Sequence, residues 1–256
     1  MTEIAVPEST AAQAEAASTD AAATDAAGPD APAPTRSTRL VLVRHAVTEQ
    51  TGPMLSGRTP GIDLSDSGRD QAEAVAERLA ALPVAVVYAS PIERTMQTAR
   101  AIAARHALDV SMLPGLIEAD YGEWTGGTLA ELAKTDLWKV VQRTPSRARF
   151  PGGETLVGMQ ARIVAALDEL VAQHRGELIV VVSHADPIKA AIAHYTGLHL
   201  DLFQRIVVSP ASVTVLELSD HAAAMVKLND TGSLDELANA PEGKEDDETK
   251  EATKNG

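Results

Sequence analysis

Residues 39–48, RLVLVRHAVT, run four apolar residues directly into an arginine and a histidine. An apolar, β-branched run of this length is typical of a strand that is buried on both faces of a parallel sheet. The same dipeptide recurs as Arg105-His106, where the surrounding residues predict the solvated last turn of a helix. What distinguishes Arg44-His45 must therefore be its place in the fold and not the dipeptide itself.

Similar apolar runs follow at 85–89 (AVVYA) and 177–183 (ELIVVVS), and segments with helical periodicity lie between them. Apolar spacing and capping patterns predict helices over 66–82, 91–105, about 128–141, 154–174 and 185–195. Further strands are predicted over 205–208, 212–218 and 222–228. This alternation predicts an α/β fold, a three-layer sandwich with a mostly parallel central sheet.

The formal charge of -14 on the 256 residues is concentrated at the two ends of the chain. Residues 1–37 carry six acids and one base, and residues 229–256 carry nine acids and three lysines. Both ends are poor in large apolar residues, so we expect disordered acidic tails around one domain at 38–228. The domain itself is close to neutral, which argues against a broad basic face for nucleic acid. The oligomeric state is left open.

The absence of cysteine excludes a disulfide framework and thiolate catalysis. The first twenty residues lack the basic start and the apolar stretch of a secretory signal. No run approaches the roughly 18 uncharged apolar residues of a membrane span. We therefore expect a cytoplasmic protein that does not associate with membranes.

Polar and basic residues follow three of the predicted strands at the point where each strand ends. Arg44-His45 follows the first strand, Ser90 and Arg94 follow the second, and Ser183-His184 follows the third. Parallel α/β sheets bind ligands at the carboxyl ends of their strands. The fold therefore predicts that these side chains meet at one edge of the sheet.

Six motifs occur in order along the chain: RHAVT (44–48), SGRTPGIDLSDSGRDQA (56–72), SPIERTMQTA (90–99), LIEADYGEWTGGT (116–128), PGGET (151–155) and VVSHADP (181–187). Together they resemble the histidine phosphatase superfamily, in particular the branch of cofactor-dependent phosphoglycerate mutases and related small-molecule phosphatases. The resemblance covers about residues 38–228. It implies a phosphoglycerate mutase-like fold and phosphoryl chemistry on a small phosphorylated substrate, with neither a metal nor another cofactor.

The resemblance assigns roles to five residues. His45 is expected to attack phosphorus and become a phosphohistidine, with its other ring nitrogen donating to a backbone carbonyl. Arg44 and Arg94 are expected to clamp the phosphate oxygens, because a planar guanidinium matches them in a bidentate manner. His184 is expected to be cationic when phosphate is bound. Glu118 is expected to protonate the leaving oxygen, which requires a raised pKa.

Other residues are secondary candidates. Gly57 and Arg58 lie where the family places a phosphate-contacting loop, in which glycine lets backbone N–H groups approach an anion. Phosphoglycerate mutases have an asparagine shortly after the first histidine, and Thr48 or Thr51 is expected to replace that phosphate contact. Glu154 is expected to stabilise the positive end of the following helix rather than to orient groups in the pocket.

We expect a phosphatase, because the candidate lid from about Trp124 to Phe150 is short and so favours water as the phosphoryl acceptor. A phosphoglycerate-type mutase, which begins with the same phosphohistidine, is the alternative. A non-catalytic phosphate-binding or scaffolding module is a third possibility, although such a module needs no proton donor. The lid arginines Arg143, Arg147 and Arg149 fit either a second anionic group on the substrate or a solvated basic rim.

Overall fold

The computed structural model of the protein describes residues 37–233. The predicted tails, 1–37 and 229–256, lie almost wholly outside the described residues, so their disorder stays a prediction. The last strand, β6 (Ala223–Asp230), continues two residues past the predicted end of the domain at Leu228. Within 37–233, no helix combines the length and the apolar character needed to cross a membrane.

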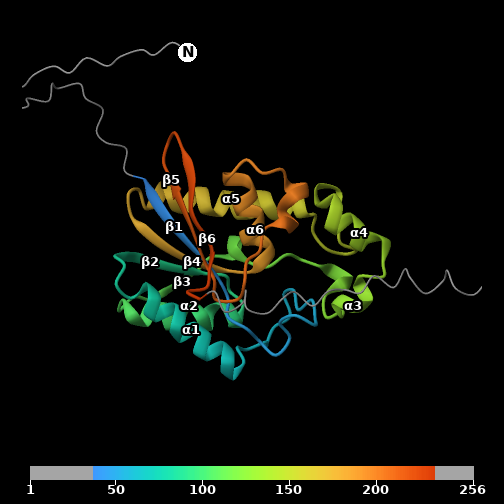
Figure 1. Ribbon diagram of the computed structural model, residues 1–256, viewed down its shortest axis with the longest axis horizontal. Coiled ribbons are helices and arrows are strands. Elements are labelled where there is room, and N and C mark those ends of the chain that lie inside the picture. Colours follow the sequence, from blue (N-terminus) through green and yellow to red (C-terminus); the bar gives the residue numbers. More distant parts are fainter. Residues whose placement is uncertain (1–36, 234–256) are drawn as a thin grey trace, which may run out of the picture. The chain divides into compact units, whose positions relative to one another are not determined.

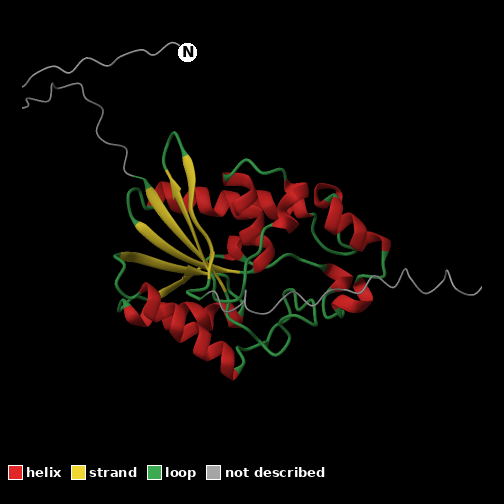
Figure 2. Cartoon of the chain, in the orientation of Figure 1, coloured by secondary structure: helices red, strands yellow, loops and turns green. Residues whose placement is uncertain are grey.

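The strands of residues 37–233 form one sheet in the order β3-β2-β4-β1-β5-β6 (Figures 1 and 2). The first four in this order are parallel to one another: β1 (Thr38–Arg44), β2 (Val84–Ala89), β3 (Val110–Met112) and β4 (Leu178–Ser183). At one edge, β5 (Val213–Leu218) pairs antiparallel with both β1 and β6. The prediction of a mostly parallel sheet is confirmed.

Helices cover both faces of this sheet (Figure 1). One face carries α1 (Asp66–Leu79) and α2 (Glu93–Arg105), and the other carries α5 (Leu156–Gln173) and α6 (Ala185–Tyr195). The candidate lid contains α3 (Leu129–Leu132) and α4 (Asp136–Arg143). Short 3-10 turns complete the domain: η1 (Pro114–Leu116), η2 (Gly122–Trp124), η3 (Pro145–Arg147) and η4 (Leu200–Arg205).

The central strand β1 is buried on both faces, as its continuous apolar run predicts. Leu40 and Leu42 pack into the core beneath α5 and α6, whereas Val41 and Val43 pack into the core beneath α1 and α2. Successive side chains of a strand point to opposite faces, so a two-sided core requires an uninterrupted apolar run. This burial holds the end of β1 rigidly, and with it the residues that follow.

The strand predicted at 205–208 is wrong. This segment includes the end of η4 and an extended stretch that joins no strand of the described sheet. Ile206 and Val208 are buried, whereas the Val207 side chain between them is 62% exposed. This alternating burial is the pattern of a strand. The carbonyl oxygen of Val208, however, accepts a hydrogen bond from a side chain, Nη1 of Arg44, at 2.7 Å.

The short strand β3 was not predicted, because two of its three residues are exposed.

The helix predicted over 91–105 starts later than expected. Helix α2 begins two residues past Pro91, at Glu93, and its N-cap residue Ile92 provides no side-chain hydrogen bond. The Ser90 hydroxyl lies instead 2.8 Å from Nε2 of His184. The Ser90 hydroxyl therefore contacts His184 and does not cap the helix.

Candidate active site

The pairing of β1 with β4 brings the two histidines together. Arg44 is in register with Ser183, and the backbone N–H of His45 donates to the carbonyl of Ser183 at 3.0 Å. His184 follows directly, and its ring centroid lies 5.3 Å from that of His45. Arg94 reaches the same place from the first turn of α2, with Nε 3.3 Å from Nε2 of His45. The strand ends therefore meet as the sequence predicted.

His45 is held with one ring nitrogen available. Its Nδ1 lies 2.7 Å from the carbonyl oxygen of Ala46, which can only accept, so Nδ1 carries the proton and Nε2 carries the lone pair. Burial, followed by the charges of Arg94 and Arg44, lowers the pKa of His45 well below its usual value. The ring is therefore neutral and carries its lone pair on Nε2, while the role of His45 as nucleophile stays a prediction.

Arg94 and Arg44 are buried cations with spare donors. Nη2 of Arg94 donates to the carbonyl of Gly57 at 2.8 Å, but its Nη1 has no hydrogen-bond partner. Nε of Arg44 is likewise buried without a partner, and neither guanidinium forms an ion pair within the described residues. Burial lowers the pKa of both groups. Buried, unpaired guanidinium donors favour an anionic ligand, because its oxygens can replace the lost water.

His184 is a fully buried, neutral histidine. Burial, then the charges of Arg94 and the neighbouring groups, lowers its pKa well below the usual value. Nη2 of Arg94 lies 3.2 Å from Nδ1 of His184 and can only donate, which directs the His184 Nε2–H toward the hydroxyl of Ser90. The sequence predicts a cationic His184 when phosphate is bound, and this stays a prediction; the charges of a phosphate would raise the pKa of His184.

Glu118 has the raised pKa that a proton donor needs. Burial, followed by the charge of Asp186, raises the pKa of Glu118 to about 7, against the opposing effect of Arg94. One carboxyl oxygen accepts from the backbone N–H of Ala119 at 2.9 Å, and the other lies 3.9 Å from Nδ1 of His184. The side chain can therefore release or accept a proton near neutral pH.

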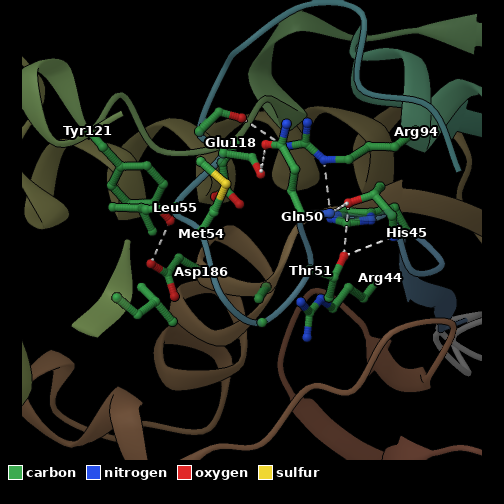
Figure 3. A pocket seen from close by; sticks show the side chains of 16 residues that line it. Arg44, His45, Gln50, Thr51, Met54, Leu55, Arg94, Glu118, Tyr121 and Asp186 are labelled. Atoms are coloured by element: carbon green, nitrogen blue, oxygen red, sulfur yellow. Dashed lines mark hydrogen bonds between the residues drawn. The ribbon is translucent and has the colours of Figure 1, made fainter. Parts of the chain in front are cut away.

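Arg44, His45, Arg94 and Glu118 line one cavity of about 220 Å³, shown in Figure 3, whereas His184 is fully buried behind them and does not line it. In that view the side chains of Arg94 and Arg44 lie on either side of the His45 ring. The lining residues are Arg44, His45, Thr48, Gln50, Thr51, Gly52, Met54, Leu55, Ser56, Gly57, Arg94, Glu118, Tyr121, Leu129, Ala185 and Asp186. The cavity thus contains Thr48 and Gly57, both predicted from the sequence.

Nine lining residues were missed by the sequence reasoning, and those with polar side chains are Gln50, Ser56, Tyr121 and Asp186. Tyr121 and Asp186 belong to quoted motifs, LIEADYGEWTGGT and VVSHADP, and their hydroxyl and carboxylate are hydrogen bonded at 2.9 Å. Membership of a motif was the available signal. It did not reveal which side chains of the motif point into the cavity.

Arg58 does not line the cavity, which corrects its predicted role in phosphate binding. Its Nε donates to the carbonyl of Glu118 at 2.8 Å, and its Nη2 donates to the carboxylate of Glu154 at 3.0 Å. Glu154 also accepts from Arg162 at 2.9 Å and from the backbone N–H of Asp120 at 2.8 Å. The expectation that Glu154 serves the following helix is therefore wrong: it anchors the loop that carries Glu118.

The lid arginines Arg143, Arg147 and Arg149 are exposed, and none of them lines the cavity. This arrangement corresponds to the solvated basic rim. Trp124 and Trp138 stack on each other at a centroid distance of 6.2 Å, so they hold the lid together. Among residues 37–233, no three histidine, aspartate or glutamate side chains are grouped so that they could hold a metal ion.

The fold and the site agree with the family that the chain matches. Residues 40–231 match the histidine phosphatase superfamily (branch 1), and the protein belongs to this superfamily. It is 34% identical over 205 residues to phosphoserine phosphatase 1 of Hydrogenobacter thermophilus, which covers 78% of this chain and 95% of the relative. It is also 34% identical over 175 residues to glucosyl-3-phosphoglycerate phosphatase of Mycolicibacterium vanbaalenii, which covers 65% of this chain and 77% of the relative.

A solved structure gives the same result. The native mycobacterial glucosyl-3-phosphoglycerate phosphatase superposes with a TM-score of 0.70 and 27% identity, over 76% of this chain and 100% of that one. The superfamily and the phosphatase activity named for these relatives support the predicted class of enzyme, a phosphomonoester hydrolase.

Proposed function

We propose that the protein hydrolyses a small phosphomonoester through a phosphohistidine on His45. The observation that carries this proposal is the Nε2 lone pair of a neutral, backbone-anchored His45, which accepts a hydrogen bond from Nε of the Arg94 guanidinium at 3.3 Å. Phosphate oxygens of the substrate would accept hydrogen bonds from the Arg94 N–H groups that now lie against His45 and His184. The phosphate would therefore bind directly beside Nε2 of His45.

In the first step, the Nε2 lone pair of His45 forms a bond to phosphorus while the bond from phosphorus to the ester oxygen breaks. Arg44 and Arg94 neutralise the non-bridging oxygens, and the preorganised charges need no rearrangement as the transition state forms. Glu118, protonated in this step, gives its proton to the departing oxygen. The products of the step are an alcohol and a phosphohistidine.

In the second step, Glu118 acts as the base. Its carboxylate takes a proton from a water molecule as the water oxygen forms a bond to phosphorus. The bond between phosphorus and Nε2 breaks, and its electron pair returns to His45. A pKa of about 7 suits both steps, because Glu118 must give a proton and then take one at the same pH.

The cavity supports a small substrate. Its volume of about 220 Å³ is below the roughly 300–1,000 Å³ of pockets that hold drug-sized ligands. A phosphate group and a short organic part fill such a space. Water as the acceptor is supported by the phosphatase activity named for the relatives, whereas a pure binding module gains nothing from a buried carboxyl with a pKa near neutrality.

The test combines turnover with trapping of the intermediate. Purified protein is expected to release phosphate from para-nitrophenyl phosphate, and His45→Ala is expected to abolish release. His194→Ala, at an exposed histidine of α6, is the matched control and should retain activity. An alkaline denaturing quench during turnover should leave an acid-labile phosphoryl group on His45.

Two outcomes contradict the proposal. Turnover that survives His45→Ala would remove the nucleophile, and saturable phosphate binding without any turnover would indicate a binding module. A mutase is separated by supplying 3-phosphoglycerate with a bisphosphoglycerate primer. Isomerisation that outpaces phosphate release would replace the hydrolase proposal by the mutase.

A further inference from the structure

The charges around the cavity suit one kind of organic group on the substrate, an inference that rests on the proposed hydrolysis at His45. The cavity has two cationic lining residues, Arg44 and Arg94, and both belong to the phosphate site. The part that remains for the rest of the substrate is lined by neutral and apolar residues and by one further carboxylate, Asp186. Figure 3 shows Asp186 and Tyr121 across the cavity from His45.

Asp186 is positioned as an acceptor with room for a donor from the cavity. Its Oδ2 accepts from the hydroxyl of Tyr121 at 2.9 Å, and the side chain is only 18% exposed. Its Oδ1 lies 3.7 Å from Nζ of Lys189, beyond hydrogen-bond distance. Lys189 does not line the cavity, and its Nζ donates instead to Gln204 at 3.1 Å. The Asp186 charge is thus only partly offset.

No described cation near the cavity is free to pair with a second anionic group on the substrate. Arg58 and Arg162 are both committed to Glu154, and neither lines the cavity. Across the described residues, the two arginines of the phosphate site are the only Lys or Arg side chains in the lining. A carboxylate beside the phosphate would therefore face Asp186 without a counter-ion, and like charges in a half-buried site repel.

We propose that the preferred substrates carry an ammonium group close to the phosphate. Phosphate esters of neutral alcohols are hydrolysed less well, and phosphate esters that carry a carboxylate are hydrolysed least. Asp186 is the residue that determines this specificity. The ammonium donates to Oδ1 of Asp186, which accepts no hydrogen bond and has only the more distant Lys189 as an ion-pair partner, while the phosphate dianion is met by Arg44 and Arg94. Each charge of such a substrate then has its own partner, which a carboxylated substrate of the same size cannot achieve.

The test uses three substrates of closely similar size: phosphoethanolamine, propyl phosphate and phosphoglycolate, which carry an ammonium, a methyl and a carboxylate group. We expect kcat/KM to fall by about tenfold at each step of this order, because one partly buried charge contact contributes roughly 1.4 kcal/mol, equal to a factor of ten. Phosphate release is measured at one pH and one ionic strength for all three.

Two variants change the charge in opposite directions. Asp186→Asn is expected to bring the ratio of kcat/KM for phosphoethanolamine over propyl phosphate close to one. Lys189→Gln removes the partial counter-ion from behind Asp186 and is expected to raise the same ratio by several-fold. Because each ratio is taken within one variant, any effect of Asp186 on Glu118 and hence on the common chemistry cancels.

The outcomes separate this inference from the proposed function. If none of the three esters, nor para-nitrophenyl phosphate, releases phosphate, the proposed hydrolase itself fails. If all three are hydrolysed but phosphoglycolate is the best, or if Asp186→Asn leaves the ratio unchanged, hydrolysis stands and the assigned specificity is overturned.

Discussion

Replacing Glu118 by glutamine tests whether its surroundings hold this carboxyl close to neutrality. The side chain is 10% exposed, and its Oε1 accepts from the backbone N–H of Ala119 at 2.9 Å. A glutamine carbonyl can accept the same hydrogen bond within the same volume. The substitution therefore removes a titrating group and leaves the packing nearly intact.

The sign of the effect follows from the direction of the pKa shift. Folding raises the pKa of Glu118 from 4.5 to about 7, first through burial and then through the charge of Asp186. The folded protein thus binds this proton more tightly than the unfolded chain, and the stability that Glu118 contributes is full below pH 4.5 and is lost as the pH rises through 7. At 1.36 kcal/mol per pKa unit, the whole loss is about 3 kcal/mol.

The glutamine variant has no such loss, so its advantage over the wild type should grow with pH. Between pH 5.5 and pH 8 we expect the difference in unfolding free energy to grow by about 2 kcal/mol in favour of Glu118→Gln. This window stays above the isoelectric point of about 4.9. Urea denaturation at the two pH values measures the difference, and phosphatase activity should fall by about 100-fold or more.

The control is Glu123→Gln, at an exposed carboxylate in the neighbouring turn η2. Its stability difference from the wild type should stay constant across the same pH range. A constant difference for Glu118→Gln, or one that shrinks as the pH rises, would show that this carboxyl is readily ionised in the folded protein. The reasoning on both its environment and its role as proton donor would then be refuted.

The other predictions concern groups that act on or beside the catalytic side chains. Asp186→Asn removes the charge that helps to raise the pKa of Glu118, so the falling high-pH limb of kcat/KM should move to lower pH in a pH–rate profile. Ser90→Ala leaves Nε2 of His184 without its buried partner, which should lower the unfolding free energy by roughly 1–3 kcal/mol. Steady-state kinetics should show kcat at least about tenfold lower with KM little changed. An unchanged kcat would contradict a positioning role for Ser90. Arg58→Gln breaks the hydrogen bond to the Glu118 carbonyl and should lower the unfolding free energy by roughly 1–3 kcal/mol. The inhibition constant of inorganic phosphate should not change. Weaker inhibition by phosphate would support the phosphate-binding role predicted from the sequence.

The spacing of apolar residues along the chain was sufficient to predict the class of the fold. The apolar run that ends at Val43 is buried on both faces because only a central strand can use two apolar faces at once. Parallel strands end at one edge of a sheet, so the order of the motifs already brought His45, Arg94 and His184 together. The same logic failed at 205–208, where alternating burial arises in an extended segment without a strand partner.

The direction of side chains in the loops was decided only by the tertiary structure. Arg58 lies next to Gly57 in one motif, yet Gly57 reaches the cavity and Arg58 turns to Glu154. Asp186, two residues past His184, reaches the cavity as well. The position of a loop in the sequence indicates which strand it follows, and the hydrogen bonds of the sheet fix where that strand ends. It does not state where a loop side chain points, because distant residues such as Glu154 compete for the same guanidinium, and that competition exists only once the chain has folded.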